Sequence, residues 1–146
     1  RFGDLHRTLE LPTMNLSGFN TARGWQLRRN WAEGVVDMEE LEAAIDAASV
    51  GPHSGVGVLA CHHPFLAPPE APLRIETRNG ERASERMAAS RVGILLSGHV
   101  HTPSAVVWRH GEDAYLSVTS GTLSQRLRRH PPSFNYLDVD ADRVSV

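Results

Sequence analysis

Two runs of large aliphatic residues dominate the hydrophobic pattern of the chain. Val56–Cys61 and Val92–Leu96 are almost continuously apolar, and polar residues bound each run. Short runs without polar alternation are typical of strands that are buried on both faces, as in parallel sheets. We therefore expect the two runs to be neighbouring strands of one buried sheet.

A segment with helical spacing precedes each of these strands. The first begins at Asp37, which can cap a helix, and Glu40 stands three residues later in the capping-box position. The residues of its apolar face are Leu41, Ala44, Ile45 and Ala48. Gly51-Pro52 is expected to end this helix. The second segment is residues 81–91, and its inward positions are Ala83, Met87 and Ala88.

Weaker patterns complete the expected fold. Residues 1–12 are polar and predict a loop, whereas residues 13–20 alternate enough to predict a strand. The proline-rich residues 65–80 predict an irregular connection, which is either a lid beside a site or a surface excursion without a role. Two hairpins follow, with their turns at residues 109–113 and 140–142. Helix–strand units followed by hairpins indicate an α/β fold.

Composition and charge permit one ordinary domain and exclude several functions. The 146 residues, of which 40% are hydrophobic, are enough for one core. The net charge is −2 and Arg126–Arg129 is the only basic run, so we expect no nucleic-acid-binding surface. No stretch approaches the roughly 18 apolar residues of a membrane span. The single cysteine, Cys61, excludes an internal disulfide and favours a cytoplasmic location.

Histidines follow both apolar runs. His62-His63-Pro64 comes directly after the first, and Gly98-His99-Val100-His101 follows the second. Because the carboxyl ends of parallel strands meet at one edge of a sheet, we expect the imidazoles of His62, His99 and His101 to lie close together. Gly98 would let the backbone turn sharply or approach a ligand there. Neutral imidazole is a good ligand for Zn, Fe and Mn, so the pattern predicts a metal site.

A strand-terminal His-His-Pro followed by Gly-His-x-His resembles the second half of the calcineurin-like metallophosphoesterases. The motifs Asp-x-His, Gly-Asp-x-x-Asp and Gly-Asn-His-Asp/Glu precede these two in that family. The last two are absent from this sequence, and Asp4-Leu5-His6 matches Asp-x-His only superficially, because no apolar strand precedes it. Residues 15–23, 120–122 and 135–140 also resemble later strands and loops of the family. The resemblance implies that residues 1–146 are the C-terminal part of a single domain, half of a four-layer α/β/β/α sandwich.

The same resemblance implies roles for three histidines. His62 and His99 would bind one metal ion, and His101 would bind the other. Two divalent ions (Mn, Fe or Zn), about 3.5–4 Å apart, would clamp a phosphodiester or phosphomonoester and lower the pKa of a bridging water. The carboxylates that offset the repulsion between the ions would come from the N-terminal motifs. This chain would therefore supply only part of a phosphoesterase site.

Other interpretations of the histidines stay open. His99 and His101 can instead be packed, hydrogen-bonded side chains at a strand end. His63 can contact substrate, hydrogen-bond to a group behind the metal ligands or only fill space, and we expect it not to bind the metal directly. The remaining candidates lie in polar turns and are expected to be exposed, namely His53, His110 and His130.

Two further functions compete with the enzyme. One is a catalytically inactive protein-interaction scaffold of the same fold. The other is a structural zinc site, which is weaker because such sites usually include several cysteines. Arg1 is not Met and Val146 lies inside an apparent strand, so we expect a fragment of a longer protein. The N-terminal half of the domain, or a second copy of the chain, is the partner expected to cover its apolar sheet face.

Overall fold

The computed structural model describes residues 8–22, 33–49, 55–69, 71, 76–124, 130–140 and 143–146. Six strands form one sheet in the order β1-β2-β3-β4-β6-β5. Their bounds are β1 Thr8–Glu10, β2 Met14–Gly18, β3 Val56–Ala60, β4 Val92–Ser97, β5 Ser104–His110 and β6 Asp113–Thr119. β2, β3, β4 and β6 are parallel, and β1 and β5 pair antiparallel at the two edges. The predicted α/β class and the central pairing of the two apolar runs are confirmed.

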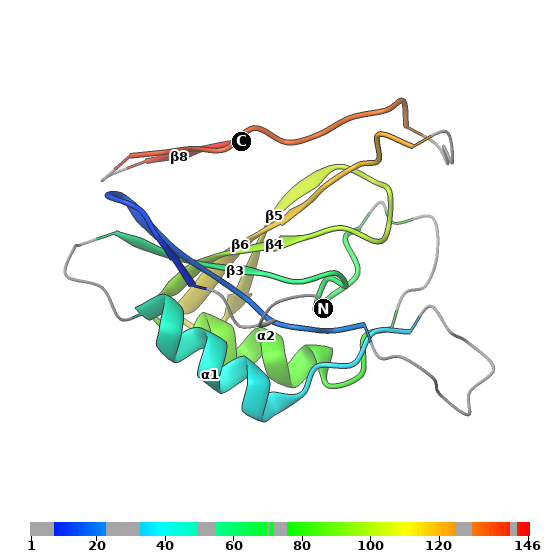
Figure 1. Cartoon of the computed structure of the whole chain (residues 1–146). Helices are drawn as coiled ribbons and strands as arrows, with labels where there is room; N and C mark the ends of the chain where they lie inside the picture. Colours follow the sequence, from blue (N-terminus) through cyan, green and yellow to red (C-terminus); the bar gives the residue numbers. More distant parts are fainter. Residues whose placement is uncertain are drawn as a thin grey trace, which may run out of the picture.

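Both helices cover the same face of the sheet (Figure 1). α1 spans Met38–Ser49 and α2 spans Gly80–Ala88. They connect β2 to β3 and β3 to β4, so two successive crossovers run in the same direction across the sheet. Such crossovers share one hand, which places their helices on one side. Within the described residues, neither helix is long and apolar enough to cross a membrane.

The start of α1 follows the sequence signal. The Oδ1 atom of Asp37 accepts the backbone N–H of Glu39 at 3.0 Å and that of Glu40 at 3.5 Å. These bonds satisfy donors that a helix start leaves without intrahelical partners. The buried face of α1 is the predicted one, Leu41, Ala44, Ile45 and Ala48. The expected stop at Gly51-Pro52 lies outside the described residues, as does the basic run at 126–129.

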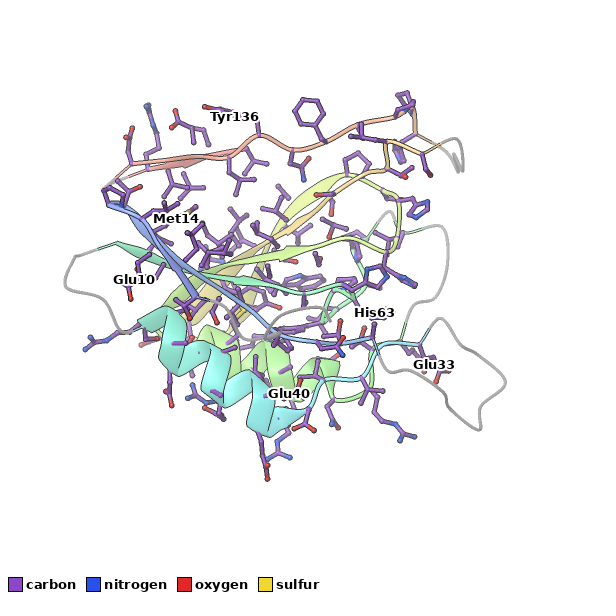
Figure 2. The ribbon with its side chains drawn as sticks, viewed as in Figure 1. Glu10, Met14, Glu33, Glu40, His63 and Tyr136 are labelled. Atoms are coloured by element: carbon purple, nitrogen blue, oxygen red, sulfur yellow. The ribbon has the colours of Figure 1, made fainter. Side chains whose placement is uncertain are left out.

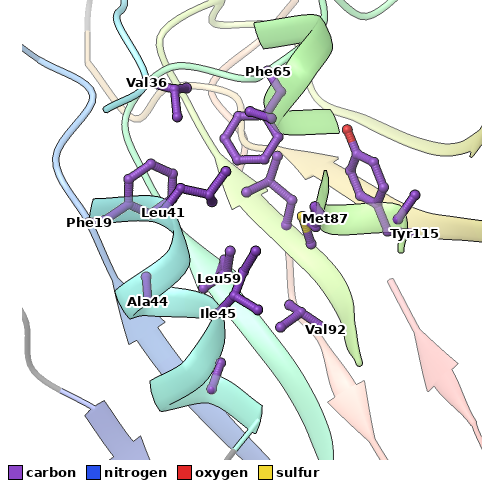
Figure 3. Packing of buried hydrophobic residues seen from close by; sticks show 14 residues of the cluster. Phe19, Val36, Leu41, Ala44, Ile45, Leu59, Phe65, Met87, Val92 and Tyr115 are labelled. Carbon is purple, nitrogen blue, oxygen red and sulfur yellow. The ribbon is translucent and has the colours of Figure 1, made fainter. Parts of the chain in front are cut away.

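The main core lies between the helices and the sheet (Figure 3). Leu41 of α1, Met87 of α2, and Leu59 and Leu95 of the sheet are completely buried there. Burying an aliphatic side chain of this size stabilises the fold by about 1.5–3 kcal/mol. Part of the core comes from loops at the carboxyl ends of the strands, because the rings of Phe19 and Phe65 lie 5.9 Å apart. The core therefore reaches the loops that carry the histidines.

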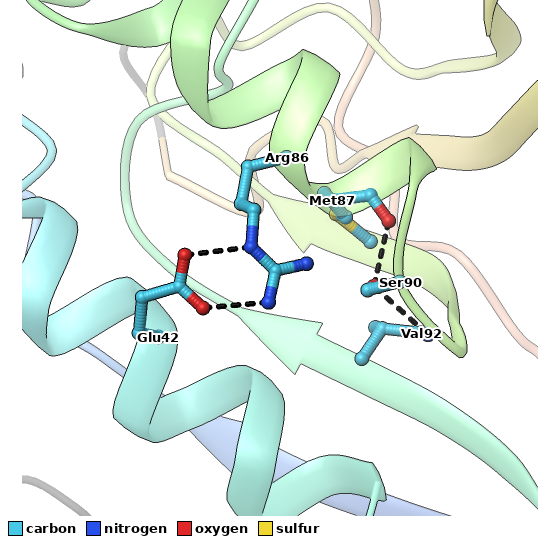
Figure 4. A network of polar contacts seen from close by, with 5 residues as sticks. All are labelled: Glu42, Arg86, Met87, Ser90 and Val92. Carbon is cyan, nitrogen blue, oxygen red and sulfur yellow. Dashed lines mark hydrogen bonds and ion pairs between the residues drawn. The ribbon is translucent and has the colours of Figure 1, made fainter.

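Two polar contacts fix the helices against each other and against the sheet (Figure 4). Arg86 of α2 donates two hydrogen bonds of 2.6 Å to the carboxylate of Glu42 on α1. Behind α2, the hydroxyl of Ser90 donates to the carbonyl of Met87 at 2.6 Å and accepts the N–H of Val92 at 3.1 Å. Ser90 thus joins the end of α2 to the start of β4.

Residues 8–10 correct the expectation of a loop over residues 1–12. They form the edge strand β1, which pairs antiparallel with β2 through Leu9 and Leu16. All three residues are exposed, so backbone pairing alone creates this strand and no buried face marks it in the sequence.

The second face of the sheet is covered by the described residues of the C-terminal segment, 133–140 and 143–146 (Figure 1). That segment ends in a small hairpin of β7 (Asp138–Val139) and β8 (Val144–Ser145). Beneath it, a separate apolar cluster is formed by Val58, Ile94 and Val118, and Leu137 and Val144 pack on the cluster. A cavity of about 210 Å³ remains between this segment and the sheet. The described fold is a mostly parallel sheet with two helices on one face and a thin third layer on the other.

Candidate metal centre

The loops after β3, β4 and β6 begin at one edge of the sheet and are tied together by backbone bonds. The N–H of Cys61 donates to the carbonyl of Leu96 at 3.0 Å, and the N–H of Gly98 donates to the carbonyl of His62 at 3.1 Å. The N–H of Ser120 donates to Ser97 at 2.8 Å. Strand pairing therefore continues past the strands and brings His62 next to the Gly-His-x-His turn.

His62 and His99 are in direct contact. Their Nε2 and Nδ1 atoms lie 3.0 Å apart, although 37 residues separate them in the chain. The predicted convergence of these two histidines is confirmed. Two imidazole nitrogens at this distance can share one proton, or both can face one cation.

His63, which is labelled in Figure 2, is buried beside this pair. Its ring centroid is 4.3 Å from that of His99 and 4.6 Å from that of His62. Thr21, which follows β2 and is completely buried, holds His63 at two atoms. The Thr21 Oγ1 atom accepts the backbone N–H of His63 at 2.9 Å and lies 3.2 Å from its ring Nδ1.

Gly34 provides the space for the His63 ring. A Cβ atom at this position would lie 2.5 Å from Cγ and 2.6 Å from Cβ of His63. Only glycine lets the backbone come this close to the imidazole. Thr21 and Gly34, which come from two separate segments of the chain, therefore set the position of the His63 side chain.

Among the described residues, one group of histidine, cysteine and carboxylate side chains has the geometry to hold a metal ion. It consists of His62, His63 and His99, whose ligand nitrogens all lie within 4.8 Å of one another. His62 is exposed, His99 is partly exposed and His63 is buried. The cluster is thus anchored on the inside and open to solvent on the outside.

The Gly-His-x-His turn holds two residues in a strained conformation. His99 has φ 64° and His101 has φ 57°, both in the left-handed region that costs an L-residue about 1–2 kcal/mol. Gly98, where we expected the unusual backbone, has no positive φ, and a Cβ atom there would come no closer than 4.0 Å to the carbonyl oxygen of His62. The sharp turn therefore falls on the histidines. Strain of this kind clusters at functional sites.

The other candidate histidines have different surroundings. His101 is partly exposed and does not belong to the three-histidine group found among the described residues. His110 was expected to be solvent-exposed and is instead partly buried, because its Nε2 lies 2.8 Å from the buried hydroxyl of Ser84. His130 is also only partly exposed. The expectation for His53 lies outside the described residues.

Cys61 contributes hydrogen bonds, and its thiol stays protonated. Burial raises the pKa of the Cys61 thiol to about 12, although a hydrogen bond from Thr21 acts in the opposite direction. At neutral pH the sulfur therefore carries its proton, and it donates to the carbonyl of His63 at 3.0 Å. Cys61 does not belong to the group of described residues that could hold a metal ion, which consists of the three imidazoles.

One large cavity that the described residues line is not at the histidines. It measures about 730 Å³ and lies beside Phe65, Trp108, Glu33, Arg78 and Glu81. None of the three clustered histidines lines it. Ligand chemistry and backbone strain point instead to the shallower edge of the sheet at His62 and His99.

Sequence reasoning did not find Thr21 or Gly34. Thr21 is 42 positions from His63, and no spacing rule connects a threonine in a loop with a histidine so far along the chain. Gly34 shows no turn motif.

Comparison with known proteins finds no protein-family model that matches this chain and no curated protein whose sequence matches it.

Proposed function

We propose that this chain is part of a metal-dependent phosphoesterase that hydrolyses a phosphodiester or a phosphomonoester. The observation that carries the proposal is the direct contact between His62 and His99 beside a strained Gly-His-x-His turn. This is the arrangement that the resemblance to calcineurin-like metallophosphoesterases implies for one metal ion. In that assignment His62 and His99 bind one ion and His101 binds the second.

The chemistry of the site suits hydrolysis of an anionic ester. Divalent metals held by imidazole polarise a phosphoryl oxygen and lower the pKa of a bound water to about 7. Their ligands here are uncharged, so the positive charge of the ions remains available to an anionic substrate. The partly exposed positions of His99 and His101 leave the centre accessible from solvent.

The dinuclear form of the site needs groups that the three-histidine cluster does not contain. Two divalent cations about 3.5–4 Å apart repel each other strongly unless carboxylates bind between them. The metal-binding group among the described residues consists only of histidines. We therefore place the carboxylates in the N-terminal half of a four-layer sandwich, whose second sheet would pack over the C-terminal segment. The single protonated cysteine fits a cytoplasmic enzyme.

The test compares the chain with the full-length protein. Residues 1–146 alone, supplied with Mn²⁺ or Zn²⁺, should not hydrolyse bis(p-nitrophenyl) phosphate, whereas the full-length protein should. In the full-length protein, His99→Ala and His101→Ala should each lower turnover by at least 100-fold, because removing a ligand destroys the metal geometry. A full-length protein that binds metal but hydrolyses neither phosphodiesters nor phosphomonoesters would support the inactive scaffold instead.

A further inference from the structure

The contacts between His63 and Thr21 bear on which ring nitrogen of His63 carries the proton. The Thr21 hydroxyl oxygen accepts the backbone N–H of His63 and also contacts its Nδ1 atom. A hydroxyl has one proton to donate. The Nδ1 atom therefore either accepts that proton or donates its own to Thr21.

Only the second case leaves Nε2 of His63 with the lone pair that a metal ligand needs, because a neutral imidazole carries its proton on one nitrogen. The Thr21 oxygen has two lone pairs, so it can accept from the backbone N–H and from Nδ1 of His63 together. The Cys61 thiol donates to the carbonyl of His63 at 3.0 Å and holds the same residue through its backbone.

The contact with Thr21 suits the tautomer of His63 that has its proton on Nδ1 and a lone pair on Nε2. A histidine that binds a metal almost always donates its other ring N–H to an oxygen, which fixes its orientation and raises its basicity. Thr21 offers that oxygen, and Gly34 leaves the room for the ring. His63 therefore has the surroundings of a metal ligand as well as the position of one.

We propose that His63 is the third imidazole ligand of a single divalent transition-metal ion held by His62, His63 and His99, and that Thr21 is the residue that holds His63 in its ligating tautomer. This inference rests on the metal-binding part of the proposed function and not on the phosphoesterase reaction. It differs from our expectation that His63 does not bind metal directly.

The donor set indicates the class of metal. Three imidazoles with an open fourth position suit zinc and chemically similar ions such as cobalt. Typical Zn–N distances are about 2.0–2.1 Å, so nitrogens that share one ion lie roughly 3.3–3.5 Å apart in a tetrahedral arrangement. The ligand nitrogens here already lie within 4.8 Å of one another. Small rotations of the rings would complete the site.

The tautomer can be measured without any metal. Nitrogen-15 NMR of the imidazoles in metal-free protein, residues 1–146, should show His63 protonated at Nδ1 and unprotonated at Nε2. The assignment comes from the loss of one imidazole spin system in His63→Gln. Protonation at Nε2 instead would overturn the proposal, because the Nε2 lone pair would then be absent.

Metal binding tests the ligand itself. Isothermal titration of the chain with Zn²⁺ should give one ion per chain, and Co²⁺ should give the visible absorption of a four-coordinate site. His63→Ala should weaken binding at least 100-fold, whereas His130→Ala, a histidine outside the cluster, should leave it unchanged. Equal affinity in His63→Ala and wild type would sink the proposal.

The proposed role of Thr21 needs a measurement that would not change if Thr21 had only a structural role. Thr21→Val keeps the shape but removes the oxygen, and it should lower Zn²⁺ affinity by about 10–100-fold and abolish the Nδ1 preference of His63. Thr21→Ser restores the oxygen and should restore both properties. If Thr21→Val unfolds, the Thr21→Ser titration and the wild-type NMR spectrum still decide. One zinc ion bound through His63 without any phosphoester hydrolysis by the full-length protein would refute the proposed function and leave this inference intact.

Discussion

Gly34→Ala should displace His63 and so distort the candidate metal centre. The added Cβ atom would lie 2.5 Å from Cγ and 2.6 Å from Cβ of His63, far inside van der Waals contact. One of the two residues has to move. The backbone at Gly34 is held on both sides, because the N–H of Val35 donates to Thr21 at 3.0 Å and the carbonyl of Gly34 accepts the N–H of Arg78 at 2.9 Å.

His63 is therefore the residue that moves, and its movement breaks its hydrogen-bond contacts with Thr21. Overpacking a buried position typically costs about 1–3 kcal/mol. With an m-value of roughly 1–3 kcal/mol/M for urea, the unfolding midpoint should fall by about 1 M at unchanged m. Zn²⁺ affinity of the folded variant should fall as well, since the imidazole no longer faces His62 and His99.

Gly93→Ala is the matched control for this substitution. Gly93 lies in β4, and a Cβ atom there would meet nothing closer than Val56 Cγ1 at 3.5 Å, an ordinary contact. Its free energy of unfolding should change by no more than about 0.5 kcal/mol, and its metal affinity should not change. If Gly34→Ala unfolds at the same urea concentration as wild type and binds Zn²⁺ equally well, the packing argument for His63 is wrong.

Three further experiments test other parts of the fold. A double-mutant cycle of Glu42→Ala and Arg86→Ala, measured by urea unfolding, should give a coupling energy of about 0.5–1 kcal/mol, because the pair is bidentate but partly exposed. Burial raises the pKa of Tyr115 to about 12, as it does for the Cys61 thiol. Both groups favour the folded state below their ordinary pKa values of 9–10, so stability should fall as pH rises from 9 to 12, and Tyr115→Phe should lessen that fall. His110→Ala should cost about 0.5–1.5 kcal/mol of stability through its lost hydrogen bond to α2 and should leave Zn²⁺ titrations unchanged.

The sequence predicted the helix-and-strand framework well, because burial leaves a periodic trace. The aliphatic runs at β3 and β4 and the apolar stripe of α1 each follow from the need to bury one face or both. β1 left no such trace, since its residues are exposed and only their backbone is paired. His110 was misjudged for a related reason, because a hairpin turn looks polar even where it packs against a helix.

The candidate site was predictable only in part. Parallel strands bring their carboxyl ends to one edge, so the contact of His62 with His99 followed from topology. The importance of Thr21 and Gly34 could not be predicted, because both act through a fold-dependent approach to His63. The strain at His99 and His101 was hidden for the same reason, since Gly98 was the residue whose type suggested an unusual backbone.

Charge connects the three-histidine centre with the proposed reaction. Three neutral imidazoles do not reduce the charge of a divalent ion, so an occupied centre keeps a net charge of about +2 at its open position. Such a centre attracts hydroxide and phosphate esters, and it repels a second cation until an anionic ligand arrives. On the proposed assignment the first ion would bind to this chain by itself, whereas the second would depend on carboxylates or on the substrate. Binding of a second ion should consequently require either the N-terminal carboxylates or an added phosphate, and a second Zn²⁺ that binds residues 1–146 without either would contradict this order of assembly.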